Sequence, residues 1–232
     1  MKKTSKRVKE FSKLSQKNKP YTLEEAVFIL KKAPRVKFDE SVDLAVTLGI
    51  DPKQSDQMVR GSVVLPHGRG KKVRVIVFCK GEESNAAKQA QADYVGAQDL
   101  IDKIQAGWLD FDVAVATPDM MRDLAKLGRV LGPRGLMPSP RAGTVTKDVG
   151  KAVKEAKAGK VEFKMNKLAG LHVSIGKISF SEAALLENAK TVIEAINKAK
   201  PQTAKGQYIK SAFISSTMGP GLKLESSEYS LI

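Results

Sequence analysis

The sequence has 232 residues, of which 42% are hydrophobic and 28% charged, and this balance excludes a disordered or fibrous chain. Its 40 lysines and arginines outnumber 25 aspartates and glutamates, giving a formal charge of +15 that favours a polyanionic partner, nucleic acid before an anionic membrane surface. No apolar run approaches the roughly 18 residues that span a bilayer, so we expect a cytosolic protein with no membrane partner.

The first twenty residues form a basic arm, with eight lysines or arginines and one acid. Val8, Phe11 and Leu14 recur at three-residue spacing, which predicts a helix with one apolar stripe packed on the body of the protein. Basic arms are common in nucleic-acid binders, although a solvated tail and a transit peptide remain alternatives.

A helix and two strands are predicted next. Thr22 and Glu25 have the spacing of a capping box, and Pro34 ends the helix that follows. Residues 37–50 change to a period of two, which predicts a half-buried strand, and a second strand follows at about 59–65. The apolar face of the first strand comprises Phe38, Val42, Leu44, Val46, Leu48 and Ile50, and its polar face comprises Asp39, Ser41, Asp43 and Thr47.

The middle of the chain alternates between short strands and helices. Strands are predicted at 73–79, 93–95 and 112–116, with helices at 82–92, 97–106, 119–127 and 148–158. Such alternation is typical of a parallel sheet with helices on both faces. Residues 129–143 hold three glycines, three prolines and three arginines, which predicts an irregular basic loop that either contacts phosphates or packs down through its apolar residues.

The glycine-rich segment before this region does not match a nucleotide-binding motif. Gly68 and Gly70 precede their strand and have the spacing of neither a P-loop nor a dinucleotide fingerprint. His67 lacks clustered metal-ligating partners, and Cys79 lies in an apolar run as a predicted core residue. We therefore expect no catalytic residues, no metal, no cofactor and no small-molecule substrate; an enzyme with a nucleotide site in the middle region is the alternative.

The C-terminal part is predicted to form strands at 161–166 and 171–175, a helix from Ser179 or Ser181 to about residue 198, and a final hairpin. Alternation from residue 208 to 216 predicts that Ile209, Ser211, Phe213, Ser215 and Thr217 share one face. A glycine turn at 219–221 then presents hydroxyls and Met218 at the hairpin tip, a chemistry that suits phosphate, ribose or base edges. An ordinary solvated hairpin is the alternative.

These patterns predict mixed α/β and α+β architecture in two domains. Residues 1–66 alone offer little core for a separate domain, and residues 159–232 offer four strands and a helix that are open on one face. We therefore expect the two ends to form one discontinuous α+β domain, interrupted by a Rossmann-like α/β insert at 67–158. Glycine or proline lies near both crossings, where a hinge is plausible.

Several motifs in the right order resemble the large-subunit ribosomal protein L1 family in its bacterial-type form. They are Lys37-Phe-Asp-Glu-Ser-Val42, Leu48-Gly-Ile-Asp-Pro52, Arg60-Gly-Ser-Val63, Leu65-Pro-His-Gly68, Gly132-Pro-Arg-Gly-Leu-Met-Pro138 and Ser216-Thr-Met-Gly-Pro220. The resemblance covers essentially the whole chain. It implies a split α+β RNA-binding domain with a Rossmann-like insert, in agreement with the organisation predicted above.

The resemblance also implies a function and a set of rRNA-binding residues. The protein would bind large-subunit rRNA in the cytoplasmic ribosome, form the mobile stalk near the tRNA exit site and assist release of deacylated tRNA. It would also repress its own operon by binding a similar structure in the messenger RNA. The implied rRNA-binding residues are Lys37, Phe38, Ser41, Asp43, Lys167, His172, Ser211, Thr217, Met218 and Gly219. Some family members have Thr in place of Ser41 and Glu in place of Asp43.

The expected mechanism is recognition of RNA shape. Small polar side chains such as Ser211 and Thr217 would bond to ribose and phosphate, while Phe38 and Met218 exclude water from those bonds. A general basic RNA chaperone, which would not discriminate among RNAs, is the other alternative.

Overall fold

The computed structural model describes residues 6–16, 19–34, 36–81, 83–204 and 206–230. The chain divides into two compact units, which we call the terminal unit (Met1–Gly70 with Val161–Ile232) and the middle unit (Lys71–Lys160). The architecture is mixed α/β with several sheets, which confirms the predicted class. That each unit is a domain with the boundaries given above stays a prediction.

The terminal unit is built on a five-stranded sheet with the order β1-β10-β9-β2-β8, so that β9 is its central strand. A separate pair, β3 with β7, forms a two-stranded sheet. The elements are α1 (Lys6–Leu14), β1 (Pro20–Tyr21), α2 (Leu23–Lys32), β2 (Ser41–Leu48), a 3-10 helix (Ser55–Gln57), β3 (Arg60–Val64), β7 (Lys160–Lys164), β8 (Gly170–Lys177), α8 (Glu182–Lys198), β9 (Ile209–Ser216), β10 (Leu222–Leu224) and α9 (Ser227–Ser230).

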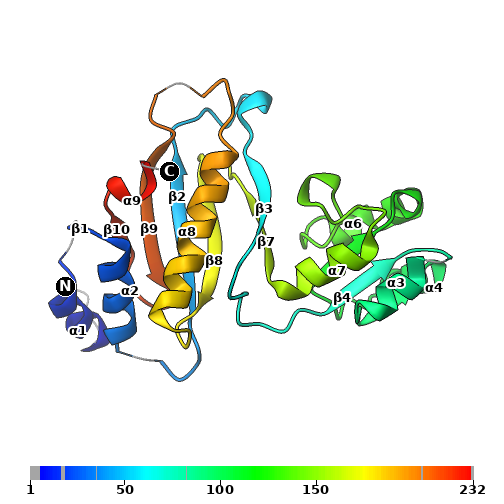
Figure 1. Cartoon of the computed structure of the whole chain (residues 1–232), viewed down its shortest axis with the longest axis horizontal. Coiled ribbons are helices and arrows are strands. Elements are labelled where there is room, and N and C mark those ends of the chain that lie inside the picture. The colour runs from blue at the N-terminus through cyan, green and yellow to red at the C-terminus, as the bar shows by residue number, and fades with distance from the viewer. Residues whose placement is uncertain (1–5, 17–18, 35, 82, 205, 231–232) are drawn as a thin grey trace. The chain divides into compact units, whose positions relative to one another are not determined.

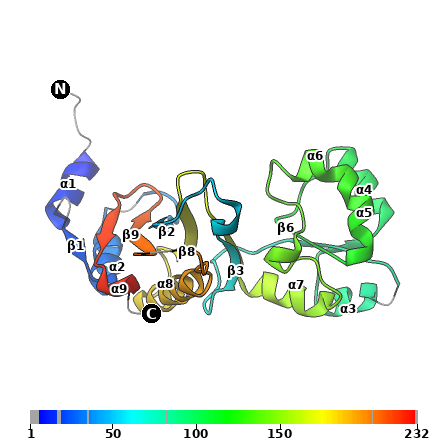
Figure 2. The ribbon, with the colours of Figure 1, turned by 90° about the horizontal axis from the view of Figure 1, so that it is seen from above.

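Helices α2 and α8 cover one face of this sheet. Along β2 the apolar side chains of Val42, Leu44 and Val46 are buried while the residues between them are partly exposed, as the period of two predicts. Both views of the ribbon place α2 and α8 over the same face (Figures 1 and 2). Their apolar stripes join the strands in one core, which includes Leu30, Leu185 and Ile196. α2 and α8 leave the opposite face uncovered, and among the described residues α1 approaches it only at the β9–β10 end. We call this opposite face the open face.

Side-chain caps fix the starts of both covering helices. The hydroxyl of Thr22 accepts a hydrogen bond from the Glu25 N–H at 3.2 Å, as predicted for the start of α2. The hydroxyl of Ser181 does the same for the Ala184 N–H at 3.2 Å, so Ser181 is the cap of α8. The other candidate, Ser179, instead donates to Asp39 Oδ2 at 2.8 Å.

Two details of the strand predictions were wrong. β2 begins at Ser41 instead of residue 37, and Phe38 lies before it with 54% of its surface exposed instead of sharing the buried face. On β9, Ile209 is buried and does not share a face with Ser211, because the pairing with β2 shifts register between Thr47 and Leu48. Such an irregularity reverses the alternation locally.

The middle unit contains a three-stranded parallel sheet with the order β5-β4-β6. Its two faces are packed in separate apolar clusters, as the near-continuous apolar strands predict; Cys79 is buried in one of them. The elements are β4 (Val75–Phe78), α3 (Glu83–Gln89), β5 (Tyr94–Gly96), α4 (Gln98–Gln105), β6 (Val113–Ala116), α5 (Met121–Leu124), α6 (Gly128–Leu131) and α7 (Val149–Ala158), with 3-10 helices at Pro118–Met120, Ala125–Leu127 and Pro140–Ala142.

The segment predicted as an irregular loop, 129–143, is partly helical. α6 runs through Leu131, which is fully buried, and a 3-10 turn covers 140–142. The irregular part of the segment is residues 132–139, between α6 and the 3-10 turn. Burial of Leu131 at the end of α6 supplies apolar stabilisation that offsets the poor helix propensity of Gly128 at its start.

No helix among the described residues is long and apolar enough to cross a membrane.

Candidate nucleic-acid interface

The open face of the five-stranded sheet carries mostly small polar side chains. From β2 it receives Ser41, Asp43, Ala45 and Thr47, from β9 Ser211, Phe213 and Ser215, and from β8 His172 and Ser174. Strand pairing sets Asp43 between Ser215 and Ser174. The structure therefore brings four of the predicted rRNA-binding residues, Ser41, Asp43, His172 and Ser211, onto one surface.

The turn after β9 is tied to the first residue of β2. The Ser41 N–H donates to the Thr217 hydroxyl at 2.9 Å, and the Thr217 N–H donates to the Ser41 carbonyl at 3.0 Å. The hydroxyl of Thr217 also lies 3.3 Å from the Ser41 carbonyl oxygen, to which it donates. These bonds hold Thr217 at the end of the open face with its side chain exposed.

The glycine turn at this end depends on close packing. A Cβ atom on Gly219 would lie 2.5 Å from the hydroxyl of Ser216, a distance that real contacts do not reach. Beside it, Met218 exposes 54% of its surface. A larger residue at 219 would therefore have to displace the Ser216 hydroxyl, which bonds to Glu40.

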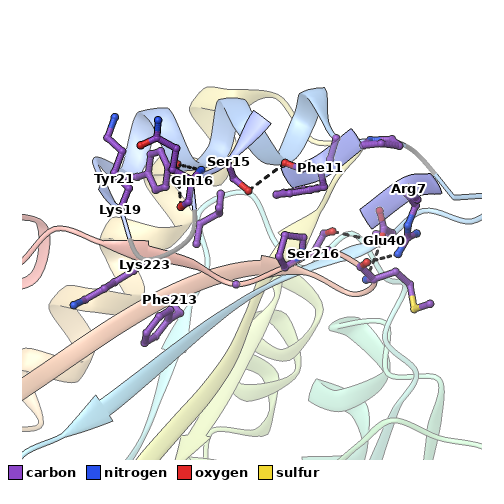
Figure 3. Close-up of a pocket in the computed structure, with 17 residues that line it drawn as sticks. Arg7, Phe11, Ser15, Gln16, Lys19, Tyr21, Glu40, Phe213, Ser216 and Lys223 are labelled. Carbon is purple, nitrogen blue, oxygen red and sulfur yellow. Dashed lines mark hydrogen bonds between the residues drawn. The ribbon is translucent and has the colours of Figure 1, made fainter. Parts of the chain in front are cut away.

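Glu40 positions Met218, and the sequence analysis did not identify it as part of the site. This carboxylate is 5% exposed, and its Oε1 atom accepts hydrogen bonds from the Met218 N–H at 2.8 Å and the Ser216 hydroxyl at 3.4 Å (Figure 3). The period of two places residue 40 on the same face as the buried Val42, but its charge kept Glu40 out of the predicted apolar face. Only the long-range pairing of β2 with β9 brings it under the turn.

The helical arm packs against the same turn. Arg7 of α1 donates to the carbonyl oxygen of Met218, and Phe11 is 5% exposed within the core (Figure 3). The predicted helix and the packing of Phe11 are confirmed. Leu14 is 42% exposed, so its predicted packing was wrong, and the side chain of Val8 lies outside the described residues.

Lys37 and Phe38 lie in the segment just before β2, and both side chains are exposed. Lys177, which sequence analysis also missed, anchors this segment because its ammonium group donates to the Ser41 hydroxyl at 2.9 Å and to the Asp39 carbonyl at 3.3 Å. Phe38 and Met218, each 54% exposed, are therefore apolar side chains on the two segments that meet at the Ser41–Thr217 hydrogen bonds.

Lys167 lies at the other end of the sheet. It is exposed in the turn between β7 and β8. β8 starts at Gly170, which pairs with Thr47, and Thr47 lies at the opposite end of β2 from Ser41. At a rise of about 3.3 Å per residue, these two ends of β2 are roughly 20 Å apart. The structure does not bring Lys167 together with Thr217; a ligand that contacts both must extend along the whole strand.

A pocket of about 810 Å³ adjoins the turn, bounded by α1, β1 and the β9–β10 hairpin (Figure 3). Its lining combines aromatic side chains with cations, among them Phe11, Tyr21, Phe213, Arg7, Lys19 and Lys223. The buried carboxylate of Glu40 also faces it. Among the described residues, no three His, Cys, Asp or Glu side chains are grouped to hold a metal ion.

This geometry suits a folded polyanion better than a small substrate. Hydroxyls, a carboxylate and an imidazole can exchange hydrogen bonds with riboses and base edges, and the exposed Lys37, Lys167 and Lys223 can neutralise phosphates. Comparison with protein-family models gives a match to the model described as the ribosomal protein L1p/L10e family, over residues 30–220. The match covers most of the chain, including both segments that form the Ser41–Thr217 hydrogen bonds.

Proposed function

The chain belongs to the ribosomal protein L1 family, and from this premise we propose that it forms the mobile stalk of the large subunit near the tRNA exit site and assists release of deacylated tRNA. Membership itself makes the protein a ribosomal, rRNA-binding component of the large subunit that acts in translation in the cytoplasm. The family is structural and RNA-binding instead of enzymatic. That this chain lacks any catalytic activity stays a prediction.

We infer that the open face of the terminal unit is the surface that grips the rRNA. One observation carries this proposal: the predicted residues Ser41, Asp43 and Ser211 share the sheet face that α2 and α8 leave uncovered, and this face ends at the turn held by Thr217. A folded RNA presents ribose hydroxyls and phosphates in a shallow groove. Hydroxyl side chains can follow those groups, and Asp43 can accept a hydrogen bond from a ribose 2′-hydroxyl.

Apolar side chains would strengthen these bonds. Phe38 and Met218 flank the Ser41–Thr217 hydrogen bonds and would exclude water from neighbouring contacts with the RNA. Hydrogen bonds in a water-poor environment are electrostatically stronger than those in bulk water. This arrangement supports recognition by shape instead of by net charge alone.

We also propose that the two units are the α+β RNA-binding domain and a Rossmann-like insert. The parallel β5-β4-β6 sheet, packed with helices on both faces, supports the second assignment. Limited proteolysis tests the division. Cleavage near residues 66–72 and 158–161 is expected to release a folded middle unit, and random cleavage throughout would contradict it.

Autoregulation is the second part of the proposal. The same face would bind a structure in the messenger RNA of its own operon that resembles the rRNA site. A reporter fused to the leader of that messenger RNA tests this directly. Overproduction of the protein should lower reporter output, and an unchanged output at saturating protein would overturn autoregulation while leaving rRNA binding untouched.

The main experiment for rRNA binding compares variants of the open face with a matched variant elsewhere in the terminal unit. Ser211→Ala and Asp43→Asn should weaken binding of stalk-region rRNA. Lys190→Gln, which removes an exposed cation from α8, should leave it nearly unchanged. Equal losses from all three variants would contradict the assignment of the open face.

A further inference from the structure

We propose that Phe213 and Lys223 form a site for one unpaired RNA nucleotide, with its base stacked on the Phe213 ring and its phosphate paired with the Lys223 ammonium group. This inference rests on the proposed function. It adds a nucleotide contact on the edge half of the sheet, beyond the residues that the family resemblance implies.

The exposure of Phe213 is the first observation. It lies on β9, the central strand of the sheet, on the face that α2 and α8 leave open, and 36% of its surface is accessible. Most apolar side chains of this strand, such as Ala212 and Ile214, are buried on the opposite face. An aromatic ring displayed on an open sheet is the arrangement on which RNA-binding sheets stack unpaired bases.

The surroundings of the ring leave room for a flat base. Directly across on β2 lies Ala45, and the neighbours two residues away on the same face are Ser211 and Ser215. On the other side, a Cβ atom on Gly221 would lie 3.9 Å from the ring Cδ1 atom. Because residue 221 is glycine, it places no side chain over the ring from this side. With these small neighbours, 36% of Phe213 stays accessible, on the side where it lines the pocket.

The positive charge of Lys223 beside the Phe213 ring favours a ligand that carries a phosphate next to a base. Lys223 on β10 pairs directly with Phe213 across the strands, so both side chains project from the same face, as Figure 3 shows. Both residues line the 810 Å³ pocket, together with Arg7 and Lys19. Among the residues described, no ion pair occupies the Lys223 ammonium group. A base beside a phosphate fits this pairing of an aromatic ring with cations.

His172 extends the same row of residues. Ala45 lies between Phe213 on β9 and His172 on β8, and the imidazole is exposed. The row from Lys223 to His172 therefore crosses four neighbouring strands with a cation at one end and a hydrogen-bonding ring at the other. An RNA strand that crosses the sheet along this row would place one base over Phe213.

The test compares three variants in binding to stalk-region rRNA. Phe213→Leu keeps apolar volume but removes the aromatic face, Phe213→Trp keeps the face, and Phe28→Leu alters another exposed phenylalanine, on α2 and 46% exposed. Because stacking is worth about 1–3 kcal/mol per base, Phe213→Leu should weaken binding by about 5- to 150-fold. The other two variants should bind within about twofold of wild type.

A fluorescent base supplies an independent readout. With 2-aminopurine placed in turn at each unpaired position of the RNA, one position should be quenched on binding wild-type protein and not on binding Phe213→Leu. Thermal melting of the free variants confirms folding. If wild type binds the rRNA selectively but Phe213→Leu matches Phe28→Leu and no position differs, the stacking site is wrong and the proposed function stands. If wild-type protein itself binds RNA without selectivity, both the stacking site and the proposed rRNA-binding surface are overturned.

Discussion

The hydroxyl of Thr217 accepts a hydrogen bond from the backbone N–H of Ser41 at 2.9 Å, although the two residues are 176 positions apart in the chain. The Thr217 N–H donates in return to the Ser41 carbonyl at 3.0 Å. The hydroxyl that the family resemblance assigns to RNA thus has a partner within the protein. It orients the turn and presents its remaining lone pair at the surface.

Replacement of Thr217 by valine therefore removes both the hydrogen bond from the Ser41 N–H and the proposed hydrogen bond to RNA. We expect the affinity for stalk-region rRNA to fall by about 1–3 kcal/mol, because the Ser41 N–H and an RNA group lose a partner. Thr217→Ser, which retains the hydroxyl, should recover most of the affinity. Isothermal titration of both variants measures this, and a valine variant that binds like wild type would refute the role of the hydroxyl.

The buried carboxylate of Glu40 should matter for RNA binding without touching the RNA. Glu40→Ala leaves the N–H of Met218 unpaired, and we expect a loss of about 1–2 kcal/mol in RNA affinity. Glu40→Gln keeps an oxygen acceptor at the same place and should restore the affinity. If alanine and glutamine variants lose affinity equally, the negative charge is what matters, and the positioning role is wrong.

Charges of the basic arm can be separated from its packing. Deletion of residues 1–14 would also remove Phe11 from the core, so we expect it to lower stability as well as binding. Exchange of exposed Lys9 and Lys13 for glutamine leaves Phe11 in place.

If the arm neutralises phosphates, the slope of log affinity against log salt should become shallower by about 0.7–0.9 for each phosphate that is no longer neutralised. Binding titrations at four salt concentrations give this slope. A slope equal to that of wild type would rule out phosphate binding by these two lysines.

Burial raises the pKa of Tyr208 to about 12, and its hydroxyl donates to the Ile196 carbonyl at 3.2 Å. The fold therefore favours the neutral phenol, whereas the unfolded chain releases this proton near pH 10. The stability contributed by the neutral form is fully present below pH 10 and is lost as the pH rises toward 12.

Tyr208→Phe cannot ionise, so its melting temperature should fall less than that of wild type between pH 9 and about pH 11.5. At neutral pH the variant should be less stable by about 1 kcal/mol, because the Ile196 carbonyl loses its donor. Thermal melts at neutral and alkaline pH test the two effects together. Parallel declines of both proteins would show that Tyr208 does not titrate as described.

Local patterns were sufficient to predict most elements of the fold. The period of two in residues 41–48 predicted a strand with one buried face, and the capping spacing of Thr22 predicted the start of α2, because each signal depends on neighbours within four residues. The register shift beside Ile209 and the exposure of Phe38 were not predictable in this way. The register shift depends on how β9 pairs with β2, and Phe38 is exposed because it lies before the residues that this pairing includes.

In the candidate site, too, local patterns identified some residues and missed those that depend on long-range pairing. Its surface hydroxyls were identified from motifs, but Glu40 and Lys177 were missed because their partners lie more than a hundred residues away in the chain. Likewise, no local pattern indicated that Lys167 lies at the far end of β2 from Ser41. The positioning groups of this surface become visible only when distant strands are paired.

Competition binding tests the central claim most directly. Labelled stalk-region rRNA is bound to the intact protein and challenged with excess unrelated structured RNA, at low and at moderate salt. If the open face recognises RNA shape, the label should stay bound at both salt concentrations even when unrelated RNA is in excess by orders of magnitude. If unrelated RNA displaces the label at equal concentration, the formal charge of +15 alone explains binding, and the assignment of the open face is contradicted.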